Sequence, residues 1–296
     1  MAEEYVCPFR SNPQFEYSFY VSNILQGMQR IYLIYLHSFY SVRINYTCTV
    51  HLTGLSQPHL AAPSRINYLV EIVGTFILVY AVCTAATVYA GPKIQLGVVG
   101  LDHPIMIGMG LLVAWVVIAI TYATAYRSGA QINPAVTIAL LVAGKISAKH
   151  AALYISCQTL GAVMGAAVVY SMFGSAIAAS LTLPADNNAI RALVLEIVMT
   201  FTAVYIILAT LHNIKNRIAY GVGLLAIGFA FGFNVILGGN ISGASMNPAR
   251  SFGPALMVWN FDYQWIYWVA PILGGLIASM LFLALHKDLD LPSPPT

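Results

Sequence analysis

The sequence predicts an all-α integral membrane protein with six transmembrane helices and two re-entrant half-helices, arranged as an inverted internal repeat. Three observations predict this fold: an apolar composition, six long apolar runs, and two sequence blocks that recur in the same order. The 296-residue chain is 59% hydrophobic and only 8% charged, against about 25% charged in an ordinary soluble domain. A soluble fold of this size would expose large apolar patches. The composition therefore argues against a soluble enzyme and against a nucleic-acid-binding protein.

The charge balance and the cysteines point to no polyanion, metal or cofactor. A net charge of +3 is too small to indicate a nucleic-acid partner. The four cysteines, Cys7, Cys48, Cys83 and Cys157, have neither a CxxC spacing nor a histidine at ligand spacing. No nucleotide-binding motif or catalytic constellation is present. We expect no cofactor, no metal site and no catalytic residues.

Six apolar runs are long enough to cross a membrane, which takes about 20 residues. We expect helices, because a bilayer offers backbone groups no water partner and the runs lack the alternating polarity of lipid-facing strands. The six runs lie at residues 67–90, 104–125, 150–174, 190–211, 219–238 and 263–285. Two Gly-x-x-x-Gly pairs within them, at Gly161–Gly165 and Gly228–Gly232, predict close helix packing.

Two further apolar segments, residues 134–143 and 248–258, are too short to span. At 1.5 Å per residue each would cover about 15 Å, half of the hydrocarbon core. We interpret them as half-helices that enter the membrane from opposite sides.

The basic residues predict that both termini lie in the cytoplasm. With this orientation, ten basic residues face the inside and only Lys93 and Arg191 face the outside, while Arg250 lies within the membrane. This distribution agrees with the positive-inside rule. The ten are Arg10, Arg30, Arg43, Arg65, Arg127, Lys145, Lys149, Lys215, Arg217 and Lys287.

The recurring blocks divide the chain into two copies. Residues 71–80 match residues 196–205 at seven of ten positions, and residues 128–135 match residues 242–249 at six of eight. Each copy contains three spans, an odd number, so the second copy inserts upside down relative to the first. Inverted repeats of this kind place functional sites near the membrane midplane, where discontinuous helices meet.

The two copies are expected at about residues 65–174 and 190–286 and together form the channel domain. One further segment is expected at each end of the chain. Residues 1–64 are expected to form a cytoplasmic, poorly ordered extension, with a surface-lying amphipathic helix as the alternative. Residues 287–296 are expected to form a cytoplasmic tail.

Each half-helix begins with an Asn-Pro pair. Asn133 and Asn247 are favourable N-caps, and Pro134 and Pro248 occupy the favoured first helical position. If each asparagine caps its helix through the side-chain oxygen, its NH₂ group points into the lumen. Two positive helix ends and two amide donors then repel cations. A water molecule held by both amides cannot take part in a continuous proton wire.

The doubled Asn-Pro-Ala, Asn133-Pro134-Ala135 and Asn247-Pro248-Ala249 followed by Arg250, resembles the aquaporin (major intrinsic protein) family. The resemblance covers about residues 65–286. Residues 242–255 and 265–268 look most like plant tonoplast-type aquaporins and animal aquaporins of type 8. The resemblance implies a passive channel rather than an enzyme, with one pore per subunit of a homotetramer, in the plasma membrane or an intracellular membrane. It also implies water as the permeant, and in these branches ammonia or hydrogen peroxide.

Arg250 matches the arginine of the family's outer constriction. Counting from the motifs, the other three constriction positions fall on Val113, Val235 and Ala244. Strict water channels of the family usually carry an aromatic residue at the first position and a histidine at the second. This departure predicts a wider, less polar constriction.

Glu71 and Glu196 are carboxylates inside predicted spans. The resemblance implies that they accept hydrogen bonds from the backbone of the re-entrant loops. An intramembrane acid can also relay protons, so a proton-coupled secondary transporter is an alternative. A glycerol or urea facilitator of the same fold is another; Ser251 and the pair Tyr267-Trp268 argue against it, because such facilitators typically carry Asp after the arginine and lack the aromatic pair.

Overall fold

The computed structural model describes residues 64–95, 103–213 and 217–286. The predicted N-terminal extension, apart from Ser64, and the predicted C-terminal tail lie outside the described residues. Six helices in the described part are long and apolar enough to cross a membrane, as the sequence predicts. They are α2 (Arg65–Gln95), α3 (His103–Ser128), α5 (Ala148–Phe173), α6 (Ala189–Asn213), α7 (Arg217–Ser242) and α9 (Ile266–Leu285).

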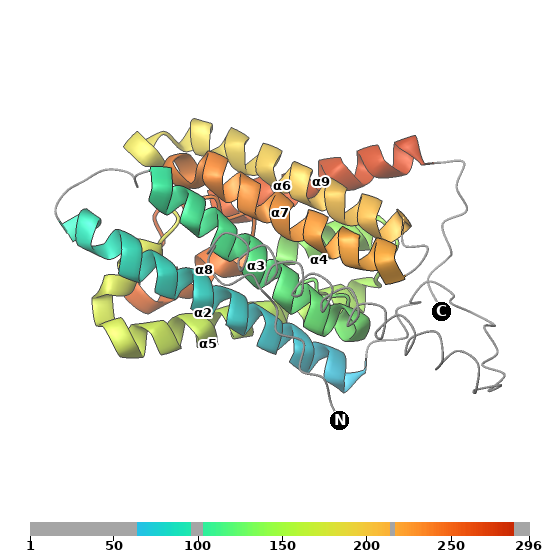
Figure 1. The fold of residues 1–296 in the computed structure, drawn as a ribbon, viewed down its shortest axis with the longest axis horizontal. Coiled ribbons are helices and arrows are strands. Elements are labelled where there is room, and N and C mark those ends of the chain that lie inside the picture. The colour runs from blue at the N-terminus through green and yellow to red at the C-terminus, as the bar shows by residue number, and fades with distance from the viewer. Residues whose placement is uncertain (1–63, 96–102, 214–216, 287–296) are drawn as a thin grey trace, which may run out of the picture. The chain divides into compact units, whose positions relative to one another are not determined.

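Two short helices agree with the predicted half-helices to within one residue. They are α4 (Pro134–Val142) and α8 (Pro248–Val258), and they lie in the interior between the long helices (Figure 1). The sequence did not predict two short 3₁₀ helices after α5. They are η1 (Gly174–Ser180) and η2 (Ala185–Asn187).

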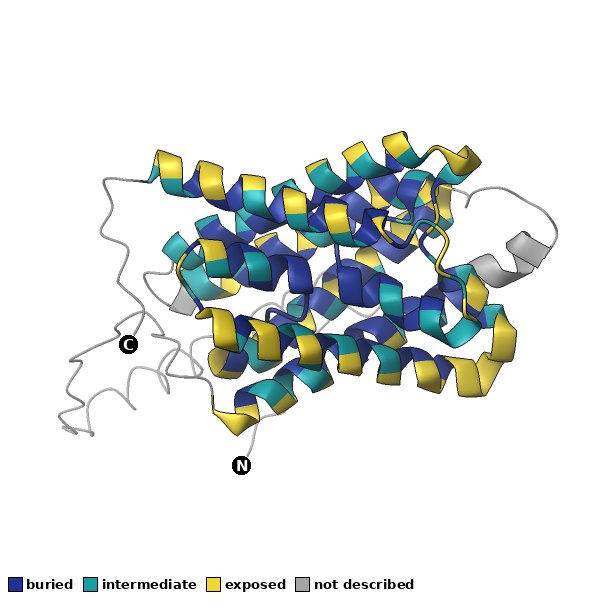
Figure 2. Ribbon diagram, turned by 180° about the vertical axis from the view of Figure 1, so that it is seen from behind, coloured by how far each residue is buried: buried dark blue, intermediate teal, exposed yellow. Residues whose placement is uncertain are grey.

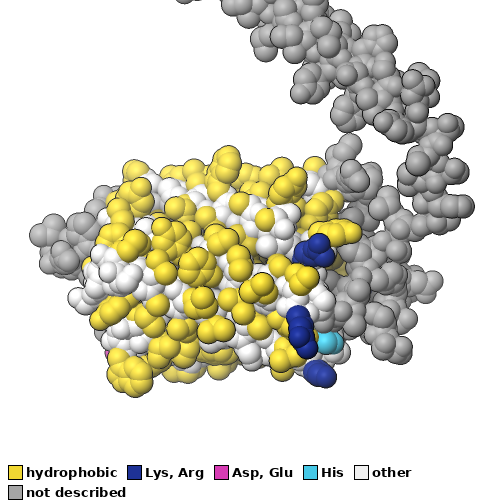
Figure 3. Space-filling view, turned by 90° about the horizontal axis from the view of Figure 1, so that it is seen from below, with side chains coloured by type: hydrophobic (Ala, Val, Ile, Leu, Met, Phe, Trp, Pro, Cys, Tyr) yellow, Lys and Arg dark blue, Asp and Glu magenta, His cyan; other side chains and the backbone are white. Residues whose placement is uncertain are grey.

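The long helices are apolar on the side that faces away from the bundle. On α2, Leu69, Val73 and Ile77 are exposed at four-residue intervals, while Glu71 and Thr75 on another face are fully buried. A helix in water has the opposite pattern. Figure 2 shows the buried faces turned inward, and Figure 3 shows a wide hydrophobic surface with basic side chains at one end. Lipid around the bundle accounts for this pattern.

The long helices and the half-helices pack in the same pattern in both halves. Helix α2 packs on α5 and α3, as α6 packs on α9 and α7. Each half-helix packs on the last long helix of the opposite half: α4 packs on α9, and α8 packs on α5. Helix α3 packs on α7, which is its counterpart in the second half. The internal repeat seen in the sequence is therefore also a structural repeat.

Both Gly-x-x-x-Gly pairs lie at close helix contacts, as predicted. A Cβ atom at Gly161 or Gly165 would collide with backbone carbonyls of α2, the first of them that of Ile72. A Cβ atom at Gly228 or Gly232 would collide with backbone carbonyls of α3. These glycines let the helices approach closely enough for their backbones to touch.

Candidate functional site

The two Asn-Pro pairs begin the half-helices as the sequence predicts. Asn133 has extended backbone angles, and its Oδ1 accepts a hydrogen bond from the Ala135 N–H at 2.9 Å. Asn247 does the same for the N–H groups of Ala249 at 3.0 Å and Arg250 at 3.3 Å. Pro134 and Pro248 follow at the first helical position. A proline costs nothing there, since its missing N–H would have no partner inside the helix.

The two asparagines are joined across the repeat. Asn133 Nδ2 donates to the Met246 carbonyl at 2.7 Å, and Asn247 Nδ2 donates to the Ile132 carbonyl at 3.0 Å. The N-termini of α4 and α8 therefore meet, and the half-helices enter from opposite ends. The predicted lumen-facing NH₂ groups need a correction, because one hydrogen of each is used in these cross-links. An amide nitrogen carries two hydrogens, so one on each asparagine is left for a molecule beside them.

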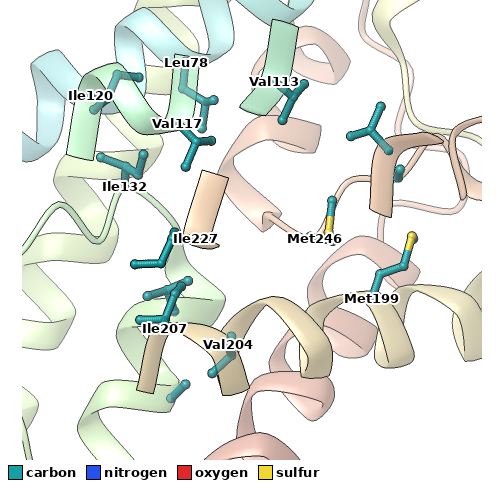
Figure 4. Packing of buried hydrophobic residues seen from close by; sticks show 14 of the residues in the cluster. Leu78, Val113, Val117, Ile120, Ile132, Met199, Val204, Ile207, Ile227 and Met246 are labelled. Atoms are coloured by element: carbon teal, nitrogen blue, oxygen red, sulfur yellow. The ribbon is translucent and has the colours of Figure 1, made fainter. Parts of the chain in front are cut away.

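A cavity of about 460 Å³ lies at this meeting point. Both asparagines line it, whereas Pro134, Ala135, Pro248 and Ala249 are buried and are not part of its wall. Most of the remaining wall is apolar and comes from both halves. Figure 4 shows some of these side chains, among them Leu78, Val113 and Ile227, within the cluster of buried hydrophobic residues. All four predicted constriction residues line this same cavity: Val113, Val235, Ala244 and Arg250.

Arg250 is a buried cation that is held by neutral groups. It is 8% exposed, and its Nη1 donates to the Ser180 carbonyl at 2.8 Å. Within the described residues, no carboxylate lies at ion-pair distance from its guanidinium. A charge in an apolar environment is costly unless it has partners or faces water. The cavity supplies that water-accessible side, so the positive charge of Arg250 acts on whatever occupies the cavity.

Glu71 and Glu196 bind the backbones of the loops that precede the half-helices. The Glu71 carboxylate accepts the N–H groups of Gln131 at 3.0 Å and Ile132 at 2.7 Å. Glu196 accepts those of Ser245 and Met246, both at 2.7 Å. Both carboxylates are fully buried, and neither lines the cavity. This arrangement matches the contact implied by the family resemblance: both acids face the loop backbones, and the loop residues that they bind line the cavity in their place.

These contacts also orient the loop carbonyls. In a trans peptide the C=O points opposite to the N–H of the next residue. Because the N–H groups of Gln131 and Ile132 point at Glu71, the carbonyls of Ala130 and Gln131 point away from it. In the second half, the N–H groups of Ser245 and Met246 point at Glu196. The carbonyls of Ala244 and Ser245 therefore point away from it. The loops thus turn carbonyl acceptors away from the acids, on the side where these residues line the cavity.

Both loops reach this geometry through left-handed backbone angles at matching positions. Ala130 and Ile132 have φ of 49° and 42°, and Ala244 and Met246 have φ of 42° and 51°. Left-handed angles at residues other than glycine are strained, and such residues gather at functional sites. One residue earlier in each loop, Gly129 and Gly243 both have φ of 83°. Glycine adopts this angle without strain because it has no Cβ atom.

Comparison with known proteins agrees with this geometry. The family model described as "Major intrinsic protein" matches residues 59–282. The chain belongs to the major intrinsic protein family. Members of this family are membrane channels and not enzymes, so the chain is a multi-pass membrane transport protein. The match begins at residue 59, which leaves most of the predicted N-terminal extension outside it.

Several relatives within the family match most of the chain. It is 38% identical over 220 residues to "Probable aquaporin TIP4-1" of Oryza sativa subsp. japonica, covering 73% of this chain and 85% of the relative. It is 34% identical over 236 residues to "Aquaporin Z" of Rhodopseudomonas palustris, covering 75% of this chain and 94% of that one. The tonoplast-type plant branch that the sequence resembles is therefore among its relatives.

A solved structure shows the same fold. The X-ray structure of the aquaglyceroporin from Plasmodium falciparum superposes with a TM-score of 0.56 over 76% of this chain and 97% of that chain. At 22% identity, this likeness supports the architecture of six spans and two short helices.

Two tyrosines of this family member complete the loop supports, and sequence reasoning missed this role for both. Tyr154 OH donates to the Ser128 carbonyl at 3.2 Å, and Tyr267 OH donates to the Ser242 carbonyl at 2.7 Å. Each tyrosine follows its serine at almost the same distance along the chain, 26 and 25 residues. That spacing is a signal that alignment of the two repeats could have found.

Gln158 is a third residue that sequence reasoning missed, and it has no equivalent in the second half. Its Nε2 donates to Glu71 Oε2 at 2.8 Å and to Thr137 Oγ1 at 2.9 Å. In the second half, Ser242 Oγ donates to Glu196 Oε1 at 2.7 Å. Glu71 likewise has a hydrogen bond with Ser128, the matching serine of its own loop, so Gln158 is an additional partner that only the first acid has.

Proposed function

We propose that this chain is a passive water channel whose permeation path is the cavity between the two half-helices. The single observation that carries the proposal is the pair of crossed hydrogen bonds between Asn133 and Asn247 and the opposite loops. These bonds bring two helix N-termini and two amide donors to one point on the cavity wall. The wall offers water few other donors, so a passing molecule is oriented at this point.

The arrangement also accounts for exclusion of protons and ions. Each helix N-terminus carries roughly half a positive charge, and Arg250 adds a full charge on the same cavity. A cation in the cavity is therefore repelled. A water molecule that accepts hydrogen bonds from both asparagines has its oxygen occupied, so it cannot accept a proton from its neighbour.

The solute range follows from the four constriction residues. Three of them, Val113, Val235 and Ala244, are apolar and offer a solute no side-chain hydrogen bond. A solute that gives up many hydrogen bonds to enter loses more free energy than one that gives up few. Hydrogen peroxide and ammonia are therefore expected to pass together with water, and glycerol to pass poorly.

A channel explains the two acids better than the alternative of a proton-coupled transporter. A proton relay needs a carboxylate that exchanges protons with the transport path. Glu71 and Glu196 instead each accept two backbone N–H groups and are fully buried away from the cavity. We assign both residues to holding the pore loops in place.

In the membrane, we place both termini in the cytoplasm and four copies in a homotetramer, each with its own pore. The orientation rests on the basic residues, which the sequence concentrates on one side. The exposed apolar faces of the helices allow contact with lipid or with neighbouring copies.

Stopped-flow light scattering on proteoliposomes tests the function. Water, ammonia, urea, glycerol and hydrogen peroxide are compared at equal protein density, with empty liposomes as the control. The proposal predicts fast water flux that is unchanged by proton or sodium gradients. Water flux equal to that of empty liposomes, or solute uptake that requires a gradient, would contradict it.

A further inference from the structure

The last residue of η1 and the segment that follows it are attached to two consecutive residues of α8. The Ser180 carbonyl accepts a hydrogen bond from Arg250 Nη1 at 2.8 Å. Two residues later, Thr182 Oγ1 donates to Ser251 Oγ at 2.7 Å. One attachment thus involves the constriction arginine itself, and the other involves its direct neighbour.

The second attachment continues as a chain of buried hydroxyl groups into the pore loop. Ser251 Oγ lies 2.5 Å from Ser245 Oγ. Ser245 Oγ also bonds to the Asn247 carbonyl at 2.9 Å, and its backbone N–H donates to Glu196 at 2.7 Å. The chain therefore links the segment after η1 to the loop that carries the second asparagine.

Burial makes these hydroxyl bonds hard to replace. Thr182 and Ser251 are fully buried, and Ser245 is 5% exposed. Where water cannot substitute, losing one partner of a buried hydrogen bond leaves the other partner unsatisfied. The backbone of Thr182 also packs on Gly243, where an added Cβ would come within 3.0 Å of Thr182 Cα. The segment after η1 is thus fastened by a specific contact and not only by apolar packing.

We propose that Thr182 is a positioning residue for selectivity: through Ser251 and Ser245 it holds the Ser180 carbonyl where it fixes the guanidinium of Arg250. The proposal deepens the proposed function, since it rests on Arg250 forming the constriction. It assigns a role to a residue that lies outside the cavity wall. If the hydroxyl bond is lost, the segment moves more freely, and the guanidinium loses the partner that keeps it in one position.

The consequence is a wider constriction for solutes larger than water. Thr182→Val keeps the side-chain size and removes the hydroxyl. Thr182 also hydrogen-bonds with Tyr267. In this variant Ser251 Oγ keeps Ser245 as a partner and Tyr267 OH keeps the Ser242 carbonyl, so no buried group is left without a partner. Water needs little width and should still pass. Urea should pass more easily, with the urea-to-water permeability ratio rising about fivefold, the factor that loss of one hydrogen bond of ordinary net strength produces.

The test measures this ratio by stopped-flow light scattering in proteoliposomes for Thr182→Val, Arg250→Val and the double variant. Thr182→Ser keeps the hydroxyl and should restore the wild-type ratio. Thr202→Val is the matched control, because the hydrogen bond of Thr202 Oγ1, to the Val198 carbonyl at 2.9 Å, lies within its own helix. Should Thr182→Val fail to reconstitute, Ser251→Ala breaks the same link from the other side and is assessed in the same way.

The double variant separates positioning from a general structural defect. If Thr182 acts through Arg250, Thr182→Val raises the ratio in the wild type and leaves it unchanged in the Arg250→Val background. An equal increase in both backgrounds, or no increase in the wild type, would overturn the proposal. If Arg250→Val itself leaves the ratio unchanged, the assigned constriction is wrong, which is a failure of the proposed function.

Discussion

Asn133 and Asn247 each bind the carbonyl of the residue that precedes the other asparagine. The two bonds, 2.7 Å to Met246 and 3.0 Å to Ile132, fix the distance and the angle between the two half-helices. Each asparagine also caps its own helix through Oδ1. Each of the two asparagine side chains therefore does three things: it caps its own helix, it binds the loop of the other half, and it offers a donor to the cavity.

Replacing Arg250 with Val should weaken cation exclusion while water flow persists. The substitution removes the full charge from the cavity and leaves an apolar constriction with Val113, Val235 and Ala244. Cation conductance in planar bilayers and water permeability in proteoliposomes measure the two effects. Unchanged selectivity in this variant would show that Arg250 is only structural.

Mercurials should inhibit the wild type weakly. Cys83 is fully buried, Cys157 is partly buried, and neither lines the cavity. Ala244→Cys places a thiol on the cavity wall and should create strong block of water flux, reversible by a reducing agent. Ala162→Cys, at a fully buried position away from the cavity, serves as the control. Strong block of the wild type that disappears on removing Cys83 or Cys157 would show a different lumen.

Val235→His should reduce hydrogen peroxide flux more than water flux. The imidazole narrows the constriction and adds a hydrogen-bond donor beside Arg250. The larger solute loses more from the narrowing than water does. Peroxide uptake into dye-loaded liposomes and water flux are compared in the same preparation, with Val235→Leu as an apolar control. An equal loss of both fluxes would mean that Val235 is not part of the filter.

Glu71→Gln should destabilise the protein. A glutamine offers one acceptor oxygen and turns an NH₂ group toward the N–H groups of Gln131 and Ile132. Loss of a buried hydrogen bond to a charged group costs about 1.5–3 kcal/mol. Thermal unfolding in detergent measures the change in Tm.

Asp186→Asn is the control for this change in stability. The ion pair of Asp186 with Arg191 at 2.9 Å is solvent-exposed and should contribute less than about 1 kcal/mol. A Tm of Glu71→Gln equal to that of Asp186→Asn would contradict the supporting role of Glu71.

The fold was predictable from the sequence because two sequence features, the long apolar runs and the internal repeat, indicate it directly. Long apolar runs mark spans in a membrane, and the repeat of residues 71–80 and 128–135 shows the relation between the halves. The half-helices agree closely because Asn and Pro mark a helix start locally. The 3₁₀ helix η1 was not predictable, since residues 174–180 continue the apolar composition of the preceding span.

The site was predictable only where side-chain identity carries the contact. Arg250, the two asparagines and the two glutamates lie where the motifs place them. The Ser180 carbonyl that holds Arg250 has no signal of its own, because any residue supplies a carbonyl. The bond between Thr182 and Ser251 joins segments 69 residues apart, and no local pattern indicates it.

The central claim is that the cavity conducts water and excludes protons. The most direct test measures both in the same proteoliposomes, water by light scattering and protons by an internal pH dye under a potassium diffusion potential. We predict water permeability well above that of empty liposomes, with proton flux equal to theirs. Proton flux that rises together with water flux as protein density increases would contradict the account.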